Sequence, residues 1–261
     1  MNWLRIPRLE TFKLTEHVYG KSHMRFELAV DDSFFISSTQ IGKIELKDLI
    51  STLKPIQKRR LSNFSKLAIG ALLNLDERLL EDEDWELVFA SRHGDFHKTS
   101  ELLTSLANKE SLSPSGFSLS VHNAVAGMYS IFMQKKVPIT SIAAGKEGLF
   151  AALTDAYIRL SSKQVNKVVV VLVDQSLPEP FQQYSDEQQN DYALAMVLSN
   201  IEDTHTAHPH TLSFTRDVQF TASNGDSPAI PIEFAKWLKT SQAQLHLSGQ
   251  KQSWTVERLN S

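Results

Sequence analysis

The sequence of 261 residues contains no cysteine. This absence excludes disulfide bonds, thiolate metal ligands and catalysis by a thiol nucleophile, although it does not assign a redox compartment. Long apolar runs are also missing. The longest strongly apolar run, residues 168–173, is far too short to cross a bilayer, and residues 1–10 lack the apolar core of a secretory signal. We therefore expect a cytoplasmic protein without membrane insertion.

A strong charge of either sign is absent as well. The formal net charge is −3, so the chain has no basic footprint for nucleic acid or anionic lipid. Gly/Ser linkers, internal repeats and low-complexity blocks do not occur. The length and the 41% hydrophobic content suit one globular unit with a sizeable core, so residues 1–261 are predicted to form a single domain.

Hydrophobic periodicity predicts an α/β fold, with layers of helices on both sides of a mixed sheet. The predicted helical segments are 55–80, 96–107 (capped by Asp95), 123–134, 147–160 and 234–240. The predicted strands are 24–30, 85–90, 137–144, 167–173 and 193–199, with a terminal hairpin formed by 244–247 and 253–256. His205, His208 and His210 are expected in an exposed loop.

The segment from Leu112 to Ile131 is the most informative part of the chain. Its pattern indicates a loop, an extended piece and then a tightly packed helix. Together with residues 58–68, 123–127 and 137–143, this segment resembles the N-terminal half of the thiolase-fold β-ketoacyl synthases. The order of the predicted helices and strands resembles that half as well. The resemblance covers about residues 55–200, and 201–261 would be a C-terminal extension.

Those enzymes attack an acyl thioester with a cysteine at the start of a helix, where the helix dipole lowers the pKa of the thiol. Counting from Asn123 through Pro138 places that position at Gly145 and Lys146. The residues after Asn200 are too few for the second synthase half, which carries the paired catalytic histidines. The chain thus resembles the chain-length factors, and especially the short synthase-like proteins of aryl polyene clusters. Full-length chain-length factors carry glutamine at the lost cysteine position, where this chain does not.

The resemblance implies a non-catalytic subunit that forms a heterodimer with a catalytic ketosynthase and shapes its acyl tunnel, without a cofactor or a metal. The strand over 137–143 would pair with the partner's equivalent strand. Tunnel or interface residues would be Phe117, Leu119, Val121, His122, Asn123, Met128, Phe132, Met133, Pro138, Ile139 and Ser141, although ordinary core packing accounts for at least half of them. Docking of an acyl carrier protein would use Lys58, Arg59, Arg60 and Lys66, which are otherwise solvated cations.

Two other functions remain open from the residues. Ser118 or Ser120 with His122, on alternate positions of an extended segment, would suit a hydrolase or acyltransferase, but no Gly-x-Ser-x-Gly elbow or aspartate partner is evident. In the structural alternative, His122 and Asn123 hold the start of a helix by hydrogen bonds. A homodimeric scaffold that keeps only the fold is the other possibility.

Two smaller sites have chemical and structural interpretations. The segment 91–97 holds His93, Asp95 and His97, which could bind a metal only in an irregular loop, whereas a turn followed by a helix cap is the simpler interpretation. Lys146 could act as an amine nucleophile, but an exposed or interface lysine is far commoner.

Overall fold

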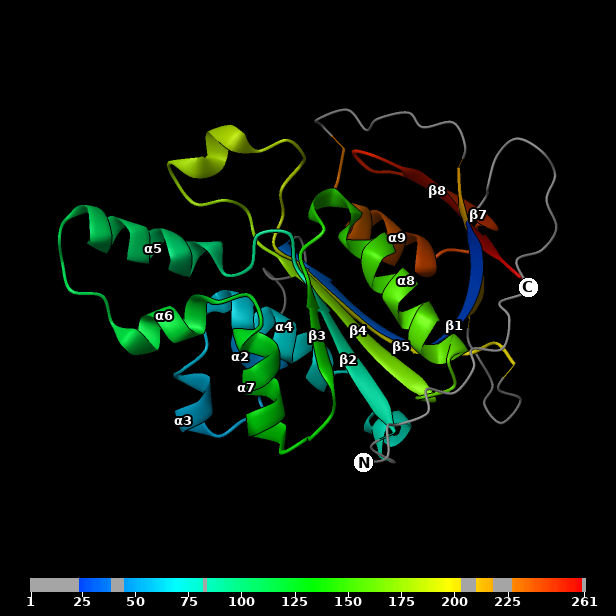
Figure 1. Ribbon diagram of the computed structural model, residues 1–261, viewed down its shortest axis with the longest axis horizontal. Coiled ribbons are helices and arrows are strands. Elements are labelled where there is room, and N and C mark those ends of the chain that lie inside the picture. Colours follow the sequence, from blue (N-terminus) through cyan, green and yellow to red (C-terminus); the bar gives the residue numbers. More distant parts are fainter. Residues whose placement is uncertain (1–23, 39–44, 82–83, 203–209, 218–226, 260–261) are drawn as a thin grey trace, which may run out of the picture.

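A single eight-stranded mixed sheet forms the centre of the computed structural model (Figure 1). The structure describes residues 24–38, 45–81, 84–202, 210–217 and 227–259. The strand order is β3-β2-β4-β5-β1-β6-β8-β7, in which β3, β2 and β4 are parallel and the other pairs are antiparallel. The strands are β1 (Arg25–Ser37), β2 (Trp85–Ala90), β3 (Ile139–Ile142), β4 (Lys167–Asp174), β5 (Tyr192–Ser199), β6 (His210–Arg216), β7 (Gln244–Ser248) and β8 (Ser253–Arg258).

Helices cover both faces of this sheet, which confirms the predicted layered α/β architecture. The α-helices are α2 (Leu46–Leu49), α3 (Pro55–Lys58), α4 (Asn63–Leu73), α5 (Phe96–Ala107), α6 (Pro114–Ser120), α7 (Ala124–Met133), α8 (Gly148–Ser161) and α9 (Ile230–Leu238). Within the described ranges, the short 3-10 helices are η1 (Glu77–Leu80), η2 (Gly145–Glu147) and η3 (Phe181–Tyr184). Helices α8 and α9 pack on one face, and α4 and α7 pack on the other.

The hydrophobic strand β4 explains why both faces need a cover. From Val168 to Asp174 its side chains are buried and point alternately to the two faces of the sheet. Val168 and Val170 lie in the core under α8, and Val169 and Val171 lie in the core under α4. A strand that is apolar on both sides is stable only between two layers. Its central position was predicted correctly, because β4 lies between β2 and β5.

Local capping explains where two of the helices begin. The Ser62 side chain accepts a hydrogen bond of 3.1 Å from the Ser65 N–H at the start of α4. Asp95 accepts one from the Lys98 N–H at the start of α5, also at 3.1 Å. The predicted cap at Asp95 and the helix over 96–107 are therefore confirmed.

The expected extended piece within residues 112–123 is wrong. Pro114–Ser120 forms the helix α6, with Pro114 in its first turn and with Ser113 accepting a hydrogen bond from the Gly116 N–H. A cap residue followed by proline starts a helix, and this local signal prevails over the alternation of serines with apolar residues. The helical pattern over 55–80 is also interrupted, because α3, α4 and η1 are separate elements.

The residues after 209 complete the sheet. His210 begins β6, so its expected position in an exposed loop is wrong, and β6 joins the sheet by pairing with β1 and β8. His205 and His208 lie outside the described residues. Helix α9 starts at Ile230 rather than at 234, and the β7–β8 hairpin is confirmed. Within the described ranges, no helix is both long and apolar enough to traverse a bilayer.

Candidate functional site

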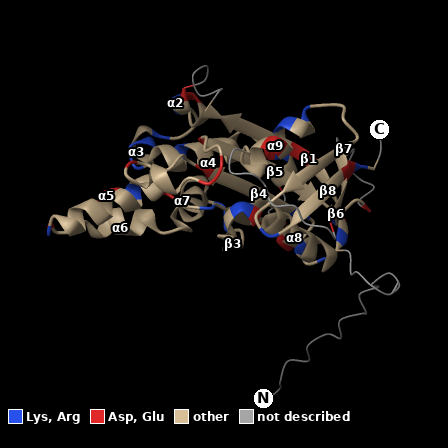
Figure 2. Ribbon diagram, turned by 90° about the horizontal axis from the view of Figure 1, so that it is seen from above, with Lys and Arg blue, Asp and Glu red and all other residues tan. Residues whose placement is uncertain are grey.

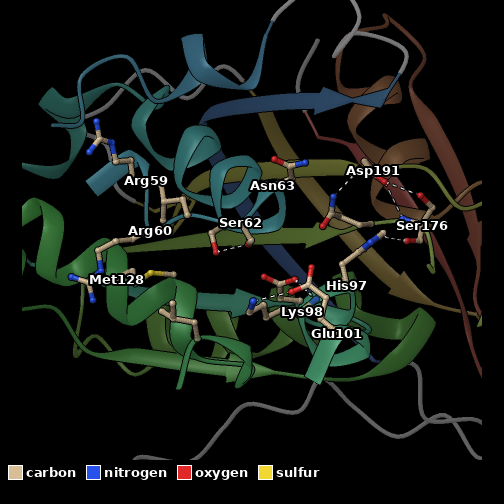
Figure 3. Close-up of a pocket in the computed structure, with 15 residues that line it drawn as sticks. Arg59, Arg60, Ser62, Asn63, His97, Lys98, Glu101, Met128, Ser176 and Asp191 are labelled. Atoms are coloured by element: carbon tan, nitrogen blue, oxygen red, sulfur yellow. Dashed lines mark hydrogen bonds and ion pairs between the residues drawn. The ribbon is translucent and has the colours of Figure 1, made fainter. Parts of the chain in front are cut away.

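A cavity of about 590 Å³ lies where the starts of α4 and α5 face the loop between β4 and β5 (Figure 3). It brings together two of the predicted sets of residues. Arg59 and Arg60 come from the predicted docking set, and Leu119 and Met128 come from the predicted tunnel set. The full lining is Arg59, Arg60, Leu61, Ser62, Asn63, Ser65, Asp95, His97, Lys98, Glu101, Leu119, Met128, Gln175, Ser176 and Asp191.

The carboxylates of this cavity are already engaged by neighbouring groups. Asp191 accepts hydrogen bonds of 3.0 Å from both the N–H and the hydroxyl of Ser176, and one of 2.8 Å from Gln175. Glu101 pairs with Lys98 at 2.8 Å, and Asp95 caps α5. Of the three cations in the lining, Lys98 is paired with Glu101, whereas Arg59 and Arg60 have no carboxylate partner among the described residues.

These two arginines belong to the basic residues around α3 (Figure 2). Arg59 and Arg60 are exposed, and neither contacts a carboxylate among the described residues. The Lys58 ammonium donates to the Ser51 carbonyl at 2.9 Å, and Lys66 donates to the Asn63 side chain at 3.3 Å. The residues proposed for docking thus form a basic surface, hereafter the α3–α4 basic surface.

The predicted tunnel residues divide into two groups. Met128 is buried in the core under α7, and Leu119, Phe132 and Met133 pack partly against that core. Phe117 and Val121, by contrast, are 59% and 40% exposed. Core packing therefore accounts for the first group, and the second group lies on a surface that the described chain does not cover.

Of the two hydrogen bonds expected at the start of α7, the one from His122 is found and the one from Asn123 is not. The His122 ring nitrogen Nε2 lies 3.1 Å from the Ser91 carbonyl, and the ring edge meets Phe89. Asn123 takes the N-cap position but makes no side-chain cap hydrogen bond. The helix start is therefore held by His122, and the predicted bond from Asn123 is wrong.

The predicted interface strand is found at one edge of the sheet, because β3 pairs only with β2 among the described strands. Pro138 is exposed, and Ile139 and Ser141 are half-buried. The Ser141 hydroxyl has no hydrogen-bond partner among the described residues. On the adjoining helix α7, a side-chain carbon added at Gly127 would meet no atom within 4 Å. This edge and the neighbouring helix surface are open to a close approach.

The expected nucleophile position holds an ion-paired lysine instead of an exposed one. The Lys146 side chain is only 8% exposed, and its ammonium donates to the Asp186 carbonyl at 2.6 Å and lies 3.5 Å from the Asp186 carboxylate. Arg92 pairs with Asp186 at 2.7 Å and with Glu187 at 3.1 Å. An exposed or interface lysine was the commoner expectation. The exposed alternative is wrong, because two carboxylates from the β4–β5 loop compensate the buried cation, and the interface alternative stays a prediction.

These contacts shift the acidity of both carboxylates. Burial opposes the ionisation of Asp186, but the hydrogen bonds and charges of Arg92 and Lys146 outweigh it and hold the Asp186 pKa below its ordinary value. Burial raises the pKa of Glu187, and Arg92 opposes that rise. The cavity beside Lys146 has a volume of about 20 Å³, which is enough for one water molecule at most.

Sequence reasoning missed Asp174, the buried carboxylate that organises this region. It accepts hydrogen bonds from the Ser91 hydroxyl, from the main-chain N–H groups of Arg92 and His93, and from the Tyr192 hydroxyl, at 2.8 to 3.1 Å. Burial raises its pKa, and these bonds oppose the rise. An aspartate that ends the most apolar strand was the available signal, since a charge there needs several partners.

The serine–histidine arrangement of the hydrolase alternative does not form. The Ser118 hydroxyl donates to the Pro114 carbonyl and the Ser120 hydroxyl to the Phe117 carbonyl, each at 2.9 Å within α6. His122 contacts the Ser91 carbonyl and neither hydroxyl. A nucleophile and a base within hydrogen-bond reach are what this chemistry needs.

The candidate metal ligands of the 91–97 turn are likewise engaged separately. Asp95 caps α5, and the His97 ring Nε2 lies 2.9 Å from the Ser176 carbonyl. Burial and the charge of Arg92 lower the pKa of His93, whose Nε2 has no hydrogen-bond partner among the described residues. The turn with a helix cap is the arrangement observed.

Comparison with known proteins adds a family and a fold. Residues 37–257 match the family model described as the N-terminal domain of β-ketoacyl synthase. The search of curated proteins found no match.

Several solved structures are similar. The ketosynthase ApeO in complex with its chain length factor ApeC, from Xenorhabdus doucetiae, matches with a TM-score of 0.69 and 24% identity, over 89% of this chain and 100% of the matched chain. The ishigamide ketosynthase/chain length factor matches with a TM-score of 0.54 and 16% identity, over 67% of this chain and 54% of the other. The AntDE:AntF complex, a type II acyl carrier protein with its ketosynthase, matches with a TM-score of 0.56 and 13% identity, over 77% and 70%.

At these identities the structural matches establish a shared fold, and they confirm the expected thiolase-like half. The family match extends over most of the sequence and includes both the cavity and the edge strand β3. The chain therefore belongs to the family of β-ketoacyl synthase N-terminal domains.

Proposed function

We propose that this chain is a non-catalytic, chain-length-factor-like subunit that forms a heterodimer with a catalytic ketosynthase and shapes its acyl tunnel. The observation that carries the proposal is Lys146, an ion-paired and nearly buried lysine at or beside the position that the count along the sequence assigns to the family's thiol. Transfer of an acyl thioester needs a nucleophile, which Lys146 does not offer while it is held by Asp186. The partner would supply the cysteine and both histidines.

The edge strand β3 is the proposed contact with that partner. Unpaired N–H and C=O groups of an edge strand readily accept a further strand, which would join the two sheets into one. The open surface at Gly127 on α7 would let an element of the partner approach closely. Exposed Phe117, Val121 and Ile131 on the neighbouring segments would provide apolar contact area.

Near that contact, the same segment would limit the acyl chain. Val121 follows α6 and is 40% exposed, so a partner's tunnel that reached this surface would end against it. A single side chain that closes a tunnel has a large steric effect for a small chemical change. The assigned gate is therefore Val121, with Phe117 and Leu119 beside it.

The α3–α4 basic surface is the proposed docking site for an acyl carrier protein, because its cations have no carboxylate partners among the described residues. Two of the similar structures are named as ketosynthase/chain length factor assemblies, and a third contains an acyl carrier protein. These names support a place in polyketide elongation. The resemblance to the synthase-like proteins of aryl polyene clusters further favours an aryl polyene product.

Co-expression with a catalytic ketosynthase tests the proposal. We expect a 1:1 complex on size-exclusion chromatography with light scattering, elongation of a carrier-bound acyl chain by the complex, and shorter products when Val121→Trp replaces the wild type. Ile158→Trp, at an exposed position of α8 on the other face of the sheet, is the matched control and should leave product length unchanged.

Three results would contradict the proposal. Elongation by this chain alone would show that it is catalytic. Failure to bind any ketosynthase would remove the partner role. A homodimer that excludes ketosynthases would favour a scaffold.

A further inference from the structure

The start of α8 is attached to two other parts of the chain by adjacent residues. On one side, the Lys146 ammonium holds the β4–β5 loop through the carbonyl and carboxylate of Asp186. On the other side, Glu147 Oε1 accepts hydrogen bonds from the main-chain N–H groups of Gln250 and Lys251, at 2.7 and 2.8 Å. Gln250 and Lys251 lie in the turn between β7 and β8.

The second contact depends on a glycine in that turn. A side-chain carbon added at Gly249 would lie 2.6 Å from Glu147 Oε1 and 2.9 Å from the Gln252 carbonyl. Both distances are shorter than carbon and oxygen atoms tolerate, so the carboxylate can approach the turn only because residue 249 is glycine. The turn and Glu147 are thus fitted to each other.

The small cavity beside Lys146 adjoins the first of these contacts, because Lys146 and Glu187 of the β4–β5 loop both line it. Ala90 and Leu172 line it from β2 and β4, and Ala229, Ile230 and Pro231 line it from the segment that begins α9. Its volume of about 20 Å³ excludes an acyl group and a thioester. The region that would present a nucleophile is therefore closed by the β4–β5 loop and by residues from the C-terminal part of the chain.

We infer that Lys146 and Glu147 act as a two-sided clamp that keeps the former nucleophile site closed: Lys146 holds the β4–β5 loop against it, and Glu147 fixes the helix start that carries Lys146 to the β7–β8 turn. This assigns a role to the C-terminal hairpin, whose turn anchors the start of α8 and so keeps Lys146 in place. The inference rests on the proposed function in one respect, since it takes Lys146 as the position of the family's nucleophile.

The absence of cysteine makes a direct test possible. Ala90→Cys places a single thiol in the wall of the small cavity, at a residue that is 1% exposed. Its rate of reaction with a water-soluble aromatic disulfide reports access to the site, because no other thiol is present. With the clamp intact, we expect the reaction to be slower by about a hundredfold than that of Ala143→Cys at a neighbouring exposed residue.

Breaking either side of the clamp should open the site. Lys146→Met, Glu147→Ala and Gly249→Ala, each combined with Ala90→Cys, should accelerate labelling by about tenfold or more. Glu147→Gln keeps an oxygen acceptor for both N–H groups and should retain the slow rate. Arg78→Met, which removes the exposed ion pair with Asp76, is the matched control and should leave the labelling rate unchanged.

Global unfolding is distinguished by a core variant remote from the clamp. Ile69→Val in α4 lowers stability without touching the clamp. If it accelerates labelling as much as the clamp variants do, the inference is wrong. Rapid labelling with the clamp intact, or unchanged labelling after its removal, would also overturn it. All of these rates are measured on the isolated chain, so failure to bind a ketosynthase would remove the proposed function without changing this result.

Discussion

Arg159 of α8 donates a hydrogen bond of 2.8 Å to the hydroxyl of Thr140 on the edge strand β3. The same guanidinium pairs with Asp155 at 2.7 Å and with Glu86 on β2. One side chain therefore connects the two outermost strands at this edge to the helix that covers them. Hydrogen bonding by Asp155 is the main reason why the Arg159 pKa is raised, which keeps this cation charged.

Arg159→Met should lower the free energy of unfolding by about 1–3 kcal/mol, because it leaves two partly buried carboxylates without their partner. Urea unfolding followed by circular dichroism measures the change. Arg78→Met is the matched control, since Arg78 pairs with Asp76 but is 83% exposed. The control should leave the free energy of unfolding nearly unchanged, because an exposed ion pair is screened by solvent. Equal losses in the two variants would show that Arg159 has no special part in holding the edge.

Substitutions at Gly127 should affect the stability of the isolated chain and its binding to a partner in different ways. Gly127→Ala should stabilise the isolated chain by up to about 1 kcal/mol, because alanine favours a helix and the added carbon meets no atom within 4 Å. Gly127→Leu should also fold, but it should weaken binding of a ketosynthase, measured by calorimetric titration. Lys236→Leu, at an exposed position of α9, is the control. Unchanged affinity of Gly127→Leu would place the partner elsewhere.

The α3–α4 basic surface should affect association more than stability. The double variant Arg59→Glu, Arg60→Glu should slow association with an acidic acyl carrier protein by about tenfold at low salt, and the difference should shrink as salt is added. Stopped-flow kinetics at several ionic strengths measures this. Charge reversal at Lys236 is the control. If the association rate constants of the variant and the wild type depended on salt concentration in the same way, docking at this surface would be excluded.

His210 should make stability depend on pH. Burial, and then the charge of Arg258, lower its pKa below the ordinary 6.5, and its ring Nδ1 lies 2.7 Å from an Arg258 nitrogen. The unfolded chain therefore binds the proton first, so this contribution is complete above pH 6.5 and decreases as the pH falls toward the folded-state pKa. Urea unfolding between pH 7.5 and about pH 5 should show the decline. His210→Asn should reduce the slope, and an unaltered slope would contradict the assignment.

Much of the fold could be predicted from local patterns. The run of valines in β4 and the cap at Asp95 each depend on residues close together in the chain, and both were predicted correctly. Helix α6 was predicted as an extended segment, because serines that alternate with apolar residues resemble the pattern of a strand. The helix-start signal, a capping serine at 113 followed by proline at 114, was not used. β6 was missed because its seven residues are stabilised by pairing with β1 and β8, far away in the sequence.

The candidate site was less predictable than the fold. The sequence indicated Arg59 and Met128 separately, but nothing in their spacing places them at one cavity. The partners of Lys146 come from a loop 40 residues later, and those of Glu147 from a turn more than 100 residues later. Contacts over such separations depend on how the strands are ordered.

The sequence by itself determined that this protein cannot use a thiol, because no cysteine is present, and its local patterns determined most helices and strands. Only the tertiary structure decided the environment of Lys146. A lysine at position 146 is compatible with an exposed, reactive or buried side chain. Its state depends on the electric field and the burial that Asp186, Glu187 and Arg92 create, and these residues meet it only when the sheet has formed.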